Sequence, residues 1–472
     1  MKIYIAIFFI FISFLGCKKE SDSANNYAYF GGEIINPNTN YVVLSKNEVV
    51  IDTIKLDGRN RFLYKVEDLE QGLYAFRHGG EYQMVLLEPK DSVLFRLNTL
   101  DFDESLVFTG DGDKKNNYLI NEYLENEKQE KYIVRLCQLT PEAYSTHVDS
   151  LKANKVKVLE HFKNKYKPSG LFLKIAQANI NYNYYSSKEV YPFVHYGTNK
   201  AANLKSLPED FYSYRKDINY NDAFLSTDYN YTAFLRHNFS NMSLKIHDEH
   251  SENTRFNRKA LCYNLDRLNL IDSLVENQTT KDDLLYHFAM RFLSKSKDEA
   301  DNNAILKSYL AKSKSENNID MMVRYTKSIN GLKEGLRLPQ INMINSNNDV
   351  VDINSLINKP TAITFWSQAY YDHFKKSHKK LNELKTKYPE VRFISINIDK
   401  CGIEKSKKIL ASHQFDQTHE YQFKNPQEGK EILAVHPMTK TIILDKNSKI
   451  VNSRSNIFSS NFEDQLLGLI NK

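Results

Sequence analysis

The chain has 472 residues, which is enough for about three domains of ordinary size. Hydrophobic residues make up 41% of it and aromatic residues 12%, which excludes a wholly disordered chain because such a composition can build apolar cores. Lysine and arginine number 64 against 58 aspartate and glutamate, a net charge of +6 mixed along the chain. Nucleic-acid binders concentrate basic residues in a stripe, so we expect no nucleic-acid partner.

The first residues are typical of an export signal. Lys2 is followed by an apolar run over 3–15, which is shorter than the roughly 20 residues that a membrane-spanning helix needs. The sequence Phe14-Leu15-Gly16-Cys17 resembles the lipobox of bacterial lipoproteins, in which the cysteine becomes the first residue and carries lipid. This resemblance implies a signal peptide over 1–16, a lipid on Cys17, a tether over 17–27 and a lipid-anchored location in the cell envelope. An ordinary signal peptide that contains a cysteine is the alternative.

Residues 28–110 alternate apolar and polar positions between closely spaced turn signals, which predicts a β-sandwich. The strands are expected over 28–35, 41–44, 49–56, 62–66, 72–76, 83–87, 92–97 and 106–108. The strings VVIDTIKLDGRNRF, LLEPKDSV and VFTGDGDKKNNYL are similar to a β-domain of unknown function that often precedes thioredoxin-like domains in lipoproteins of Gram-negative bacteria. The aromatic residues of this segment fit a β core and also fit a surface that binds an envelope glycan or peptide.

Residues 111–332 have helical periodicity and predict an α-helical middle domain that acts as a spacer. Thr140 followed by Pro141 is a typical helix start, because proline suits the first helical turn. Helices are expected over 142–166, 171–184, 209–217, 223–244, 258–274, 281–293, 304–311 and 319–329.

Residues 333–472 predict an α/β domain, so the fold class is multidomain α+β. The order is a strand over 360–366, a helix ending near Lys387, a strand over 391–399, a helix over 405–413, a hairpin over 440–451 and a helix over 461–470. The stretches GLRLPQINMINSNNDVVDINSLINKP, AITFW, YPEVRFISINID and VHPMTKTIILDKNSKIV resemble the membrane-anchored, TlpA-like thioredoxin-fold disulfide reductases. The resemblance implies a thioredoxin-like fold.

The two positions that carry the thiols in that family differ here. Active members have C-x-x-C directly after the tryptophan, where the helix N-terminus activates the first thiolate. Trp366 is followed instead by Ser367, and Tyr370 stands where the resolving thiol is expected. A serine hydroxyl forms no mixed disulfide, so the sequence predicts a redox-degenerate domain. It leaves open whether the protein is an enzyme. No catalytic residue and no cofactor are expected.

The family also has a cis-proline ahead of the hairpin. An alignment without gaps places Thr439 at that position, where a trans peptide is expected because a non-proline cis bond costs about 2.5–4 kcal/mol. A shift of the loop by two residues gives the role to Pro437 instead. The helix after Ser367 is about one turn longer than the family usually has, so its first turn is expected to be remodelled.

Other chemistries have weaker support. Asp372, His373 and His378 follow Ser367, but His373 is about 9 Å away along a helix, and no G-x-S-x-G elbow accompanies the serine, which disfavours a hydrolase. Both histidines are expected on a solvated basic helix face.

The cluster His247-Asp248-Glu249-His250 is expected to be an exposed loop or helix end, so no metal site is expected.

The four cysteines form no C-x-x-C pair. Cys401 follows the second core strand and is expected to be half-buried and structural, although a lone thiol there can form a mixed disulfide. Cys137 and Cys262 both fall in the helical segment, where an oxidising compartment permits a bridge that sequence alone does not establish.

The sequence therefore favours a lipid-anchored envelope protein that binds or scaffolds a partner protein or peptide, in an oligomeric state that it does not define. The expected groove lies between Trp366, Tyr370, Tyr371, Met438 and Thr439, and it is rimmed by Lys440. The competing interpretation is that Tyr370 and Met438 pack on each other and plug the site. The enzymatic alternative is a thiol-disulfide oxidoreductase that works without C-x-x-C, through Cys401.

Overall fold

The computed structural model describes residues 26–47, 49–251 and 256–471, which form two compact units. One unit contains the described residues up to His78 together with Tyr82–Asn121, and the other contains Gly79–Glu81 and the described chain from Glu122 onward. The predicted signal peptide over 1–16, the lipid site Cys17 and most of the tether lie outside the described residues. None of the helices in these ranges is both long enough and apolar enough to cross a membrane.

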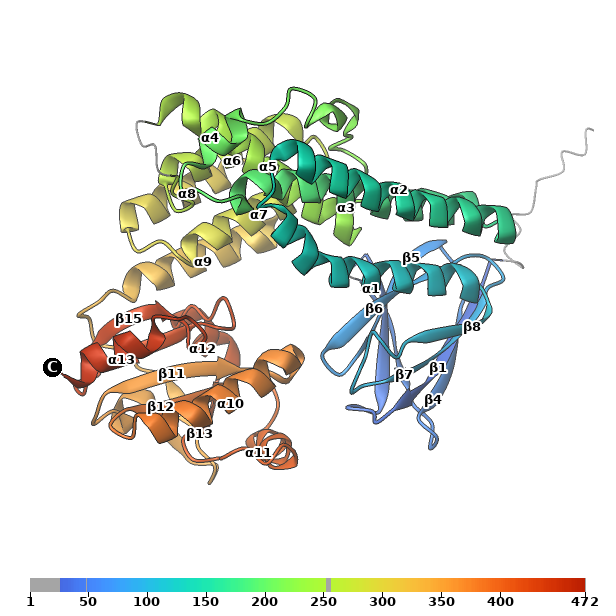
Figure 1. Ribbon diagram of the computed structural model, residues 1–472. Helices are drawn as coiled ribbons and strands as arrows, with labels where there is room; N and C mark the ends of the chain where they lie inside the picture. Colours follow the sequence, from blue (N-terminus) through green and yellow to red (C-terminus); the bar gives the residue numbers. More distant parts are fainter. Residues whose placement is uncertain (1–25, 48, 252–255, 472) are drawn as a thin grey trace, which may run out of the picture. The chain divides into compact units, whose positions relative to one another are not determined.

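Two four-stranded sheets build the first unit (Figure 1), with strand orders β4-β1-β7-β8 and β3-β2-β5-β6. The strands are β1 (Ala28–Ile35), β2 (Tyr41–Lys46), β3 (Val49–Lys55), β4 (Arg61–Val66), β5 (Gly72–His78), β6 (Glu81–Leu87), β7 (Ser92–Asn98) and β8 (Val107–Asp111). Each begins and ends within a few residues of its expected position, because alternation of apolar and polar side chains defines which face of a strand is buried.

Phenylalanines from both sheets meet in the core of this unit. Phe76 of β5 lies with its ring centroid 5.4 Å from that of Phe30 on β1 and 4.8 Å from that of Phe95 on β7. All three rings are buried, so the two sheets pack face to face as a β-sandwich. These aromatic side chains belong to the core, which removes them as a reason to expect a glycan-binding surface.

Helices make up the chain between the sandwich and residue 332. They are α1 (Asp113–Leu136), α2 (Pro141–Tyr166), α3 (Gly170–Val194), α4 (Lys200–Lys205), the 3₁₀ helix η2 (Ser213–Asp217), α5 (Tyr229–His250), α6 (Leu261–Leu274), α7 (Gln278–Leu293), α8 (Glu299–Leu310) and α9 (Glu316–Gly331). The long helix α1 was not predicted, because its sequence is dominated by charged and amide side chains and has few apolar positions from which to read a period.

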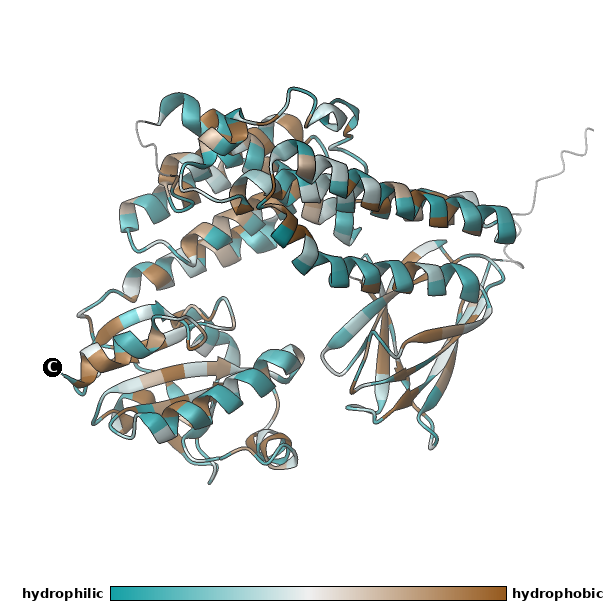
Figure 2. Ribbon diagram, viewed as in Figure 1, coloured by the Kyte–Doolittle hydropathy of each residue, from teal (hydrophilic) through white to brown (hydrophobic). Residues whose placement is uncertain are grey.

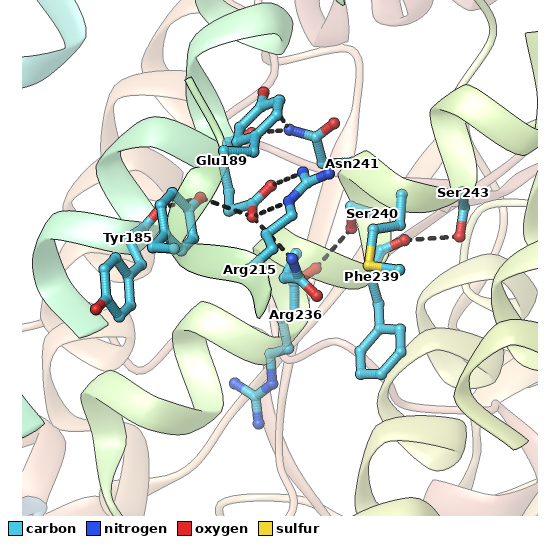
Figure 3. A network of polar contacts seen from close by, with 12 residues as sticks. Tyr185, Glu189, Arg215, Arg236, Phe239, Ser240, Asn241 and Ser243 are labelled. Carbon is cyan, nitrogen blue, oxygen red and sulfur yellow. Dashed lines mark hydrogen bonds and ion pairs between the residues drawn. The ribbon is translucent and has the colours of Figure 1, made fainter. Parts of the chain in front are cut away.

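A buried ion pair fixes the centre of the helical region, as Figure 3 shows. Glu189 of α3 is fully buried, and its carboxylate accepts hydrogen bonds from Arg215 Nε at 2.9 Å and Nη2 at 2.5 Å. Tyr214 and Asn238 donate to the same carboxylate at 2.8 and 2.7 Å. A buried charge persists only when it is paired and hydrogen-bonded, and here η2 and α5 supply the partners of Glu189 on α3.

A seven-stranded sheet with the order β10-β9-β13-β12-β11-β14-β15 forms the C-terminal part. Its elements are β9 (Asn342–Ile344), β10 (Val350–Asp352), η3 (Ile353–Leu356), β11 (Thr361–Trp366), η4 (Gln368–Tyr370), α10 (Tyr371–Lys387), β12 (Arg392–Asn397), α11 (Ile403–Ser412), β13 (Glu420–Phe423), α12 (Pro426–Ile432), β14 (Thr441–Leu444), β15 (Ile450–Ser455) and α13 (Phe462–Ile470). Strands β11 and β12 are parallel, and β14 and β15 return antiparallel, which is the thioredoxin-like arrangement.

The two faces of this sheet have different covers. Ala362, Phe393 and Ile443 point to one face, where they pack with α10 and α13 in one apolar cluster. Helix α10 is hydrophilic over most of its ribbon in Figure 2, with the few apolar positions that this contact needs. Ile363 and Phe365 point to the other face, where their cluster continues into α9 through Met322 and into the helical core.

The helical region and the C-terminal sheet therefore share one hydrophobic core. Ser453 Oγ on β15 donates to the carbonyl of Leu332 at 2.7 Å, which joins the end of the helical region to the sheet. The expected description of residues 111–332 as a spacer is wrong in this respect, because α9 supplies a wall of the sheet's core.

Candidate functional site

The site that corresponds to the family's dithiol lies where β11 and β12 end. Trp366, the last residue of β11, pairs in register with Asn397, the last residue of β12. The carboxyl ends of neighbouring parallel strands meet at the same edge, so the residues after them lie close together. Ser367 follows β11 directly, and Asp399 follows β12 by two residues.

Ser367 is held by Asp399. The Ser367 hydroxyl donates to Asp399 Oδ1 at 2.5 Å, and the backbone N–H of Gln368 donates to Asp399 Oδ2 at 2.8 Å. Ser367 Oγ in turn accepts from the backbone N–H of Ala369 at 3.1 Å, which caps the 3₁₀ turn η4. Ser367 itself is only 2% exposed, so its hydroxyl is both buried and fully engaged.

This arrangement replaces the charge that a dithiol enzyme places here. In such enzymes the N-terminus of the helix stabilises a thiolate anion. Here the Asp399 carboxylate is bound by the Ser367 hydroxyl and the Gln368 backbone amide, at the start of η4. Ser367 therefore has the role of a capping residue, and it has no thiol with which to attack a disulfide.

Tyr370 does not plug the site. Its side chain is 57% exposed, and η4 gives way to α10 directly after it, which is the remodelled first turn that the longer helix predicted. Met438 is half-buried and packs on the core that the sheet shares with the helical region. The alternative in which Tyr370 is buried against Met438 is wrong.

Trp366 does not flank a groove. It is 1% exposed, its indole N–H donates to Glu420 Oε2 at 3.0 Å, and its ring lies 4.9 Å from that of Phe374. Tyr371 is half-buried beside this cluster, with its hydroxyl 3.3 Å from His413 Nε2. Tyr370 is the exposed aromatic side chain at this edge, whereas Trp366 is a core residue.

The cis peptide bond lies at His436–Pro437, two residues before the position that a gap-free alignment gives to Thr439. Of the two positions considered, Pro437 has the cis bond. Thr441, four residues later, pairs with Thr364 on β11, so the segment that leads into β14 runs beside the end of β11. The loop is held from the helical region, because the Tyr325 hydroxyl donates to the carbonyl of His436 at 3.0 Å.

Lys440 lies inside the protein and does not rim a groove. It is 5% exposed, and its amine donates to the carbonyls of Leu433 and Ala434 at 2.7 and 3.0 Å, at the end of α12. Burial, with Arg454 nearby, lowers the pKa of Lys440 to about 7. The amine bridges the end of α12 to the strand that follows the Pro437 loop.

The two histidines of α10 are not on a solvated face. His378 is 3% exposed, with Nε2 3.5 Å from Glu420 Oε1 and Nδ1 2.8 Å from the carbonyl of Phe374. Burial, with His378 nearby, lowers the pKa of His373 to about 4. The hydrogen bonds of Ser367 go to Asp399 and Ala369 and to neither histidine, so these residues form no hydrolytic triad.

The described cysteines are all free thiols. Cys137 is buried and Cys262 is exposed, and they are not bridged. Cys401 is half-buried on the loop after β12, with its sulfur 3.6 Å from Ser406 Oγ and its carbonyl accepting from the Gln422 side chain. It lies two residues beyond Asp399, and its thiol contacts α11.

His247 and His250 form part of the last turn of α5, and α6 brings Asp266 to them. Sequence reasoning missed this third residue, as it missed Asp399 beside Ser367 and Glu420 beside Trp366. Each of these carboxylates lies far along the chain from its partner. Asp399 was the one that the sequence could have indicated. An acidic residue just after the second core strand lies at the edge of the sheet where the site was expected.

No family model matches this sequence, and no curated protein is significantly similar to it. Several solved structures that resemble about 30% of this chain are thiol-disulfide oxidoreductases. A candidate thiol-disulfide oxidoreductase of Bacteroides vulgatus is 17% identical, with 30% of this chain and 99% of that chain covered and a TM-score of 0.27. The thioredoxin domain of a thiol-disulfide oxidoreductase of Bacteroides vulgatus is 18% identical over 30% of this chain and 96% of that one, with a TM-score of 0.23. A thiol:disulfide interchange protein of a Bacteroides species is 18% identical over 30% of this chain and 89% of that one, with a TM-score of 0.23.

The buried amine of Lys440 predicts a stability that rises with pH. Its pKa is about 7 in the folded state and near 10.5 when unfolded, so the unfolded chain binds more protons between these values. The free energy of unfolding should rise across this window by up to about 1.4 kcal/mol per pH unit from this group. Chemical denaturation of the wild type and of Lys440→Met between pH 7 and 10 should show that the substitution removes this gain. The exposed control Lys446→Met should retain it, and parallel pH profiles for wild type and Lys440→Met would contradict the assignment.

Proposed function

We propose that this protein is a lipid-anchored cell-envelope protein whose thioredoxin-like part binds an extended segment of a partner protein or peptide without dithiol catalysis. The observation that carries this proposal is the place of Ser367, whose buried hydroxyl is bound to Asp399 where a reductase has its attacking thiolate. The sheet that supports a thioredoxin-like site is nevertheless complete. A domain with an intact sheet and no nucleophile can still bind a partner segment.

The exposed groups at this edge support recognition of a peptide. Tyr370 is exposed, His436 and Pro437 are exposed on the loop ahead of β14, and Met438 and Thr439 are half-buried beside them. An extended chain binds through main-chain hydrogen bonds with pockets for alternate side chains, and this mode needs no thiol. Tyrosine suits such a contact because it offers a large, stiff surface at low entropic cost.

The second candidate is a thiol-disulfide oxidoreductase that uses Cys401. It is favoured by the position of Cys401 on the same loop as Asp399, close in sequence to the carboxylate that binds Ser367. A single thiol can form a mixed disulfide, but turnover then needs a second thiol from elsewhere to release it.

Membrane attachment through Cys17 completes the proposal. The lipobox-like sequence Phe14-Leu15-Gly16-Cys17 and the apolar run before it support lipidation at the sulfur of Cys17. One acyl chain gives marginal membrane binding, whereas the several chains of a lipoprotein anchor hold a protein stably at a bilayer.

The first test is insulin reduction with dithiothreitol as the electron source. The purified chain without its signal peptide should give no turnover above background, because Ser367 and Tyr370 supply neither an attacking nor a resolving thiol. Cys401→Ser and the exposed-cysteine control Cys262→Ser should behave as the wild type does. Wild-type turnover that Cys401→Ser abolishes and Cys262→Ser retains would replace this proposal with the oxidoreductase alternative.

The second test separates binding from stability at Tyr370. A phage-displayed peptide library is selected on the wild-type chain, and the affinity of the best peptide is measured by fluorescence anisotropy. Tyr370→Ala should weaken binding about 10-fold or more, a loss of about 1.4 kcal/mol, while the free energy of unfolding changes by less than about 1 kcal/mol because the ring is exposed.

The matched control for that test is Tyr229→Ala, which removes another exposed tyrosine at the start of α5. It should bind the selected peptide as the wild type does. Equal affinities in all three proteins, or a large fall in stability in Tyr370→Ala, would contradict the proposed binding edge.

The third test concerns the anchor. Cells that express the wild type should incorporate radiolabelled palmitate into the protein, and Cys17→Ser should abolish the label because the sulfur that carries the lipid is gone. Globomycin should leave a longer, unprocessed wild-type precursor. A wild-type protein that is unlabelled and fully soluble after lysis would contradict the lipoprotein assignment.

A further inference from the structure

Four side chains of the kinds that bind transition metals converge at the junction of α5 and α6. His247 and His250 are three residues apart in the last turn of α5, and Cys262 and Asp266 are four apart in the first turns of α6. Both spacings place a pair of side chains on one face of a helix. The two helices pack against each other, so Asp266 faces both histidines and Cys262 contacts His247.

The distances suit one small ion. His247 Nδ1 is 3.8 Å from Asp266 Oδ2 and 3.4 Å from Cys262 Sγ, and His250 Nε2 is 2.8 Å from Asp266 Oδ2. Ligand atoms of His247, His250 and Asp266 all lie within 4.8 Å of one another. A tetrahedral zinc ion with bonds of about 2.0–2.3 Å separates its ligand atoms by about 3.3–3.8 Å. His250 and Asp266 would need to separate by about 0.5 Å to reach that spacing.

The neighbouring charges leave Asp266 available to a cation. Among the described residues, the ion-pair partners found for Asp266 are His247 and His250, and no lysine or arginine pairs with it. The adjacent Asp248 is instead paired with Lys205 at 2.6 Å.

We propose that His247, His250, Asp266 and Cys262 form a zinc-binding site that ties the end of α5 to the start of α6. Two imidazoles, one carboxylate and one thiolate are a donor set that zinc accepts in tetrahedral geometry, whereas calcium and magnesium prefer oxygen ligands. The Cys262 thiol loses its proton to solvent when the zinc–sulfur bond forms, so binding becomes tighter as the pH rises. Four protein ligands leave no open position, which makes the site structural and not catalytic.

The test uses the full chain without its signal peptide, stripped with EDTA and dialysed. Calorimetric titration with ZnCl₂ should show one ion per chain, with a melting temperature that rises on binding. Titration with CoCl₂ should give the visible bands of a tetrahedral site and a sulfur-to-cobalt charge-transfer band. MgCl₂ and CaCl₂ in excess should displace neither ion.

Three variants distinguish this site from adventitious binding. His250→Ala, at an exposed position, and Asp266→Ala should each weaken zinc binding about 100-fold or more, and Cys262→Ser should remove the charge-transfer band. The exposed control His161→Ala on α2 should bind as the wild type does. Unchanged affinity in His250→Ala and Asp266→Ala, with circular dichroism showing both folded, would overturn the site. A wild-type cobalt complex without the charge-transfer band would overturn the role of Cys262.

Discussion

The interior strand β11 is buried along its whole length, and the site depends on how both of its faces are covered. Its alternate residues point to opposite faces, and neither face can be left to water. One face is covered by α10 and α13, and the other is covered in part by α9 from the helical region. Because both covers are hydrophobic and shared, the end of β11 and the residues after it are held in a defined place. Trp366 and Ser367 are therefore both buried.

At that place, the chain keeps the electrostatics of a thioredoxin-like site and changes its chemistry. A helix N-terminus favours a negative group, and an active reductase supplies it as a thiolate. Here the Asp399 carboxylate is bound by the Ser367 hydroxyl and the Gln368 amide. A cysteine at position 367 would meet this carboxylate, which disfavours a second negative charge beside it. The hydroxyl at position 367 and the bonding of Asp399 therefore fit each other.

The sequence predicted the parts of this fold that repeat with a short period. The strands of the sandwich follow from alternation, whereas Ser367 and Tyr370 were identified only through the resemblance to a family with C-x-x-C after the tryptophan. It did not predict which carboxylates approach Ser367 and Trp366, because Asp399 and Glu420 reach them through tertiary packing alone. It also misplaced Lys440, whose burial depends on carbonyl groups of α12 that no local pattern reveals.

The sequence of α10 contained a periodic pattern that predicts the burial of His378, but the neighbouring lysines were given more weight. Phe374, Ser377, His378 and Leu381 recur at three- and four-residue steps and are all buried, so they define the inner face of the helix. The lysines between them suggested a solvated surface, but lysines at the remaining positions are what an amphipathic helix requires on its outer face. Position on the helix predicted the burial of His378 better than its polarity did.

The helical region bears directly on how the edge near Pro437 can bind. Tyr325 on α9 donates to the carbonyl of His436, and Lys440 binds the end of α12, so the loop is held on both sides of the cis bond before any partner arrives. Ordering a loop on binding costs free energy that reduces affinity, and a loop ordered in advance avoids that cost. The contact from α9 therefore lowers the ordering cost of any interaction that uses this loop.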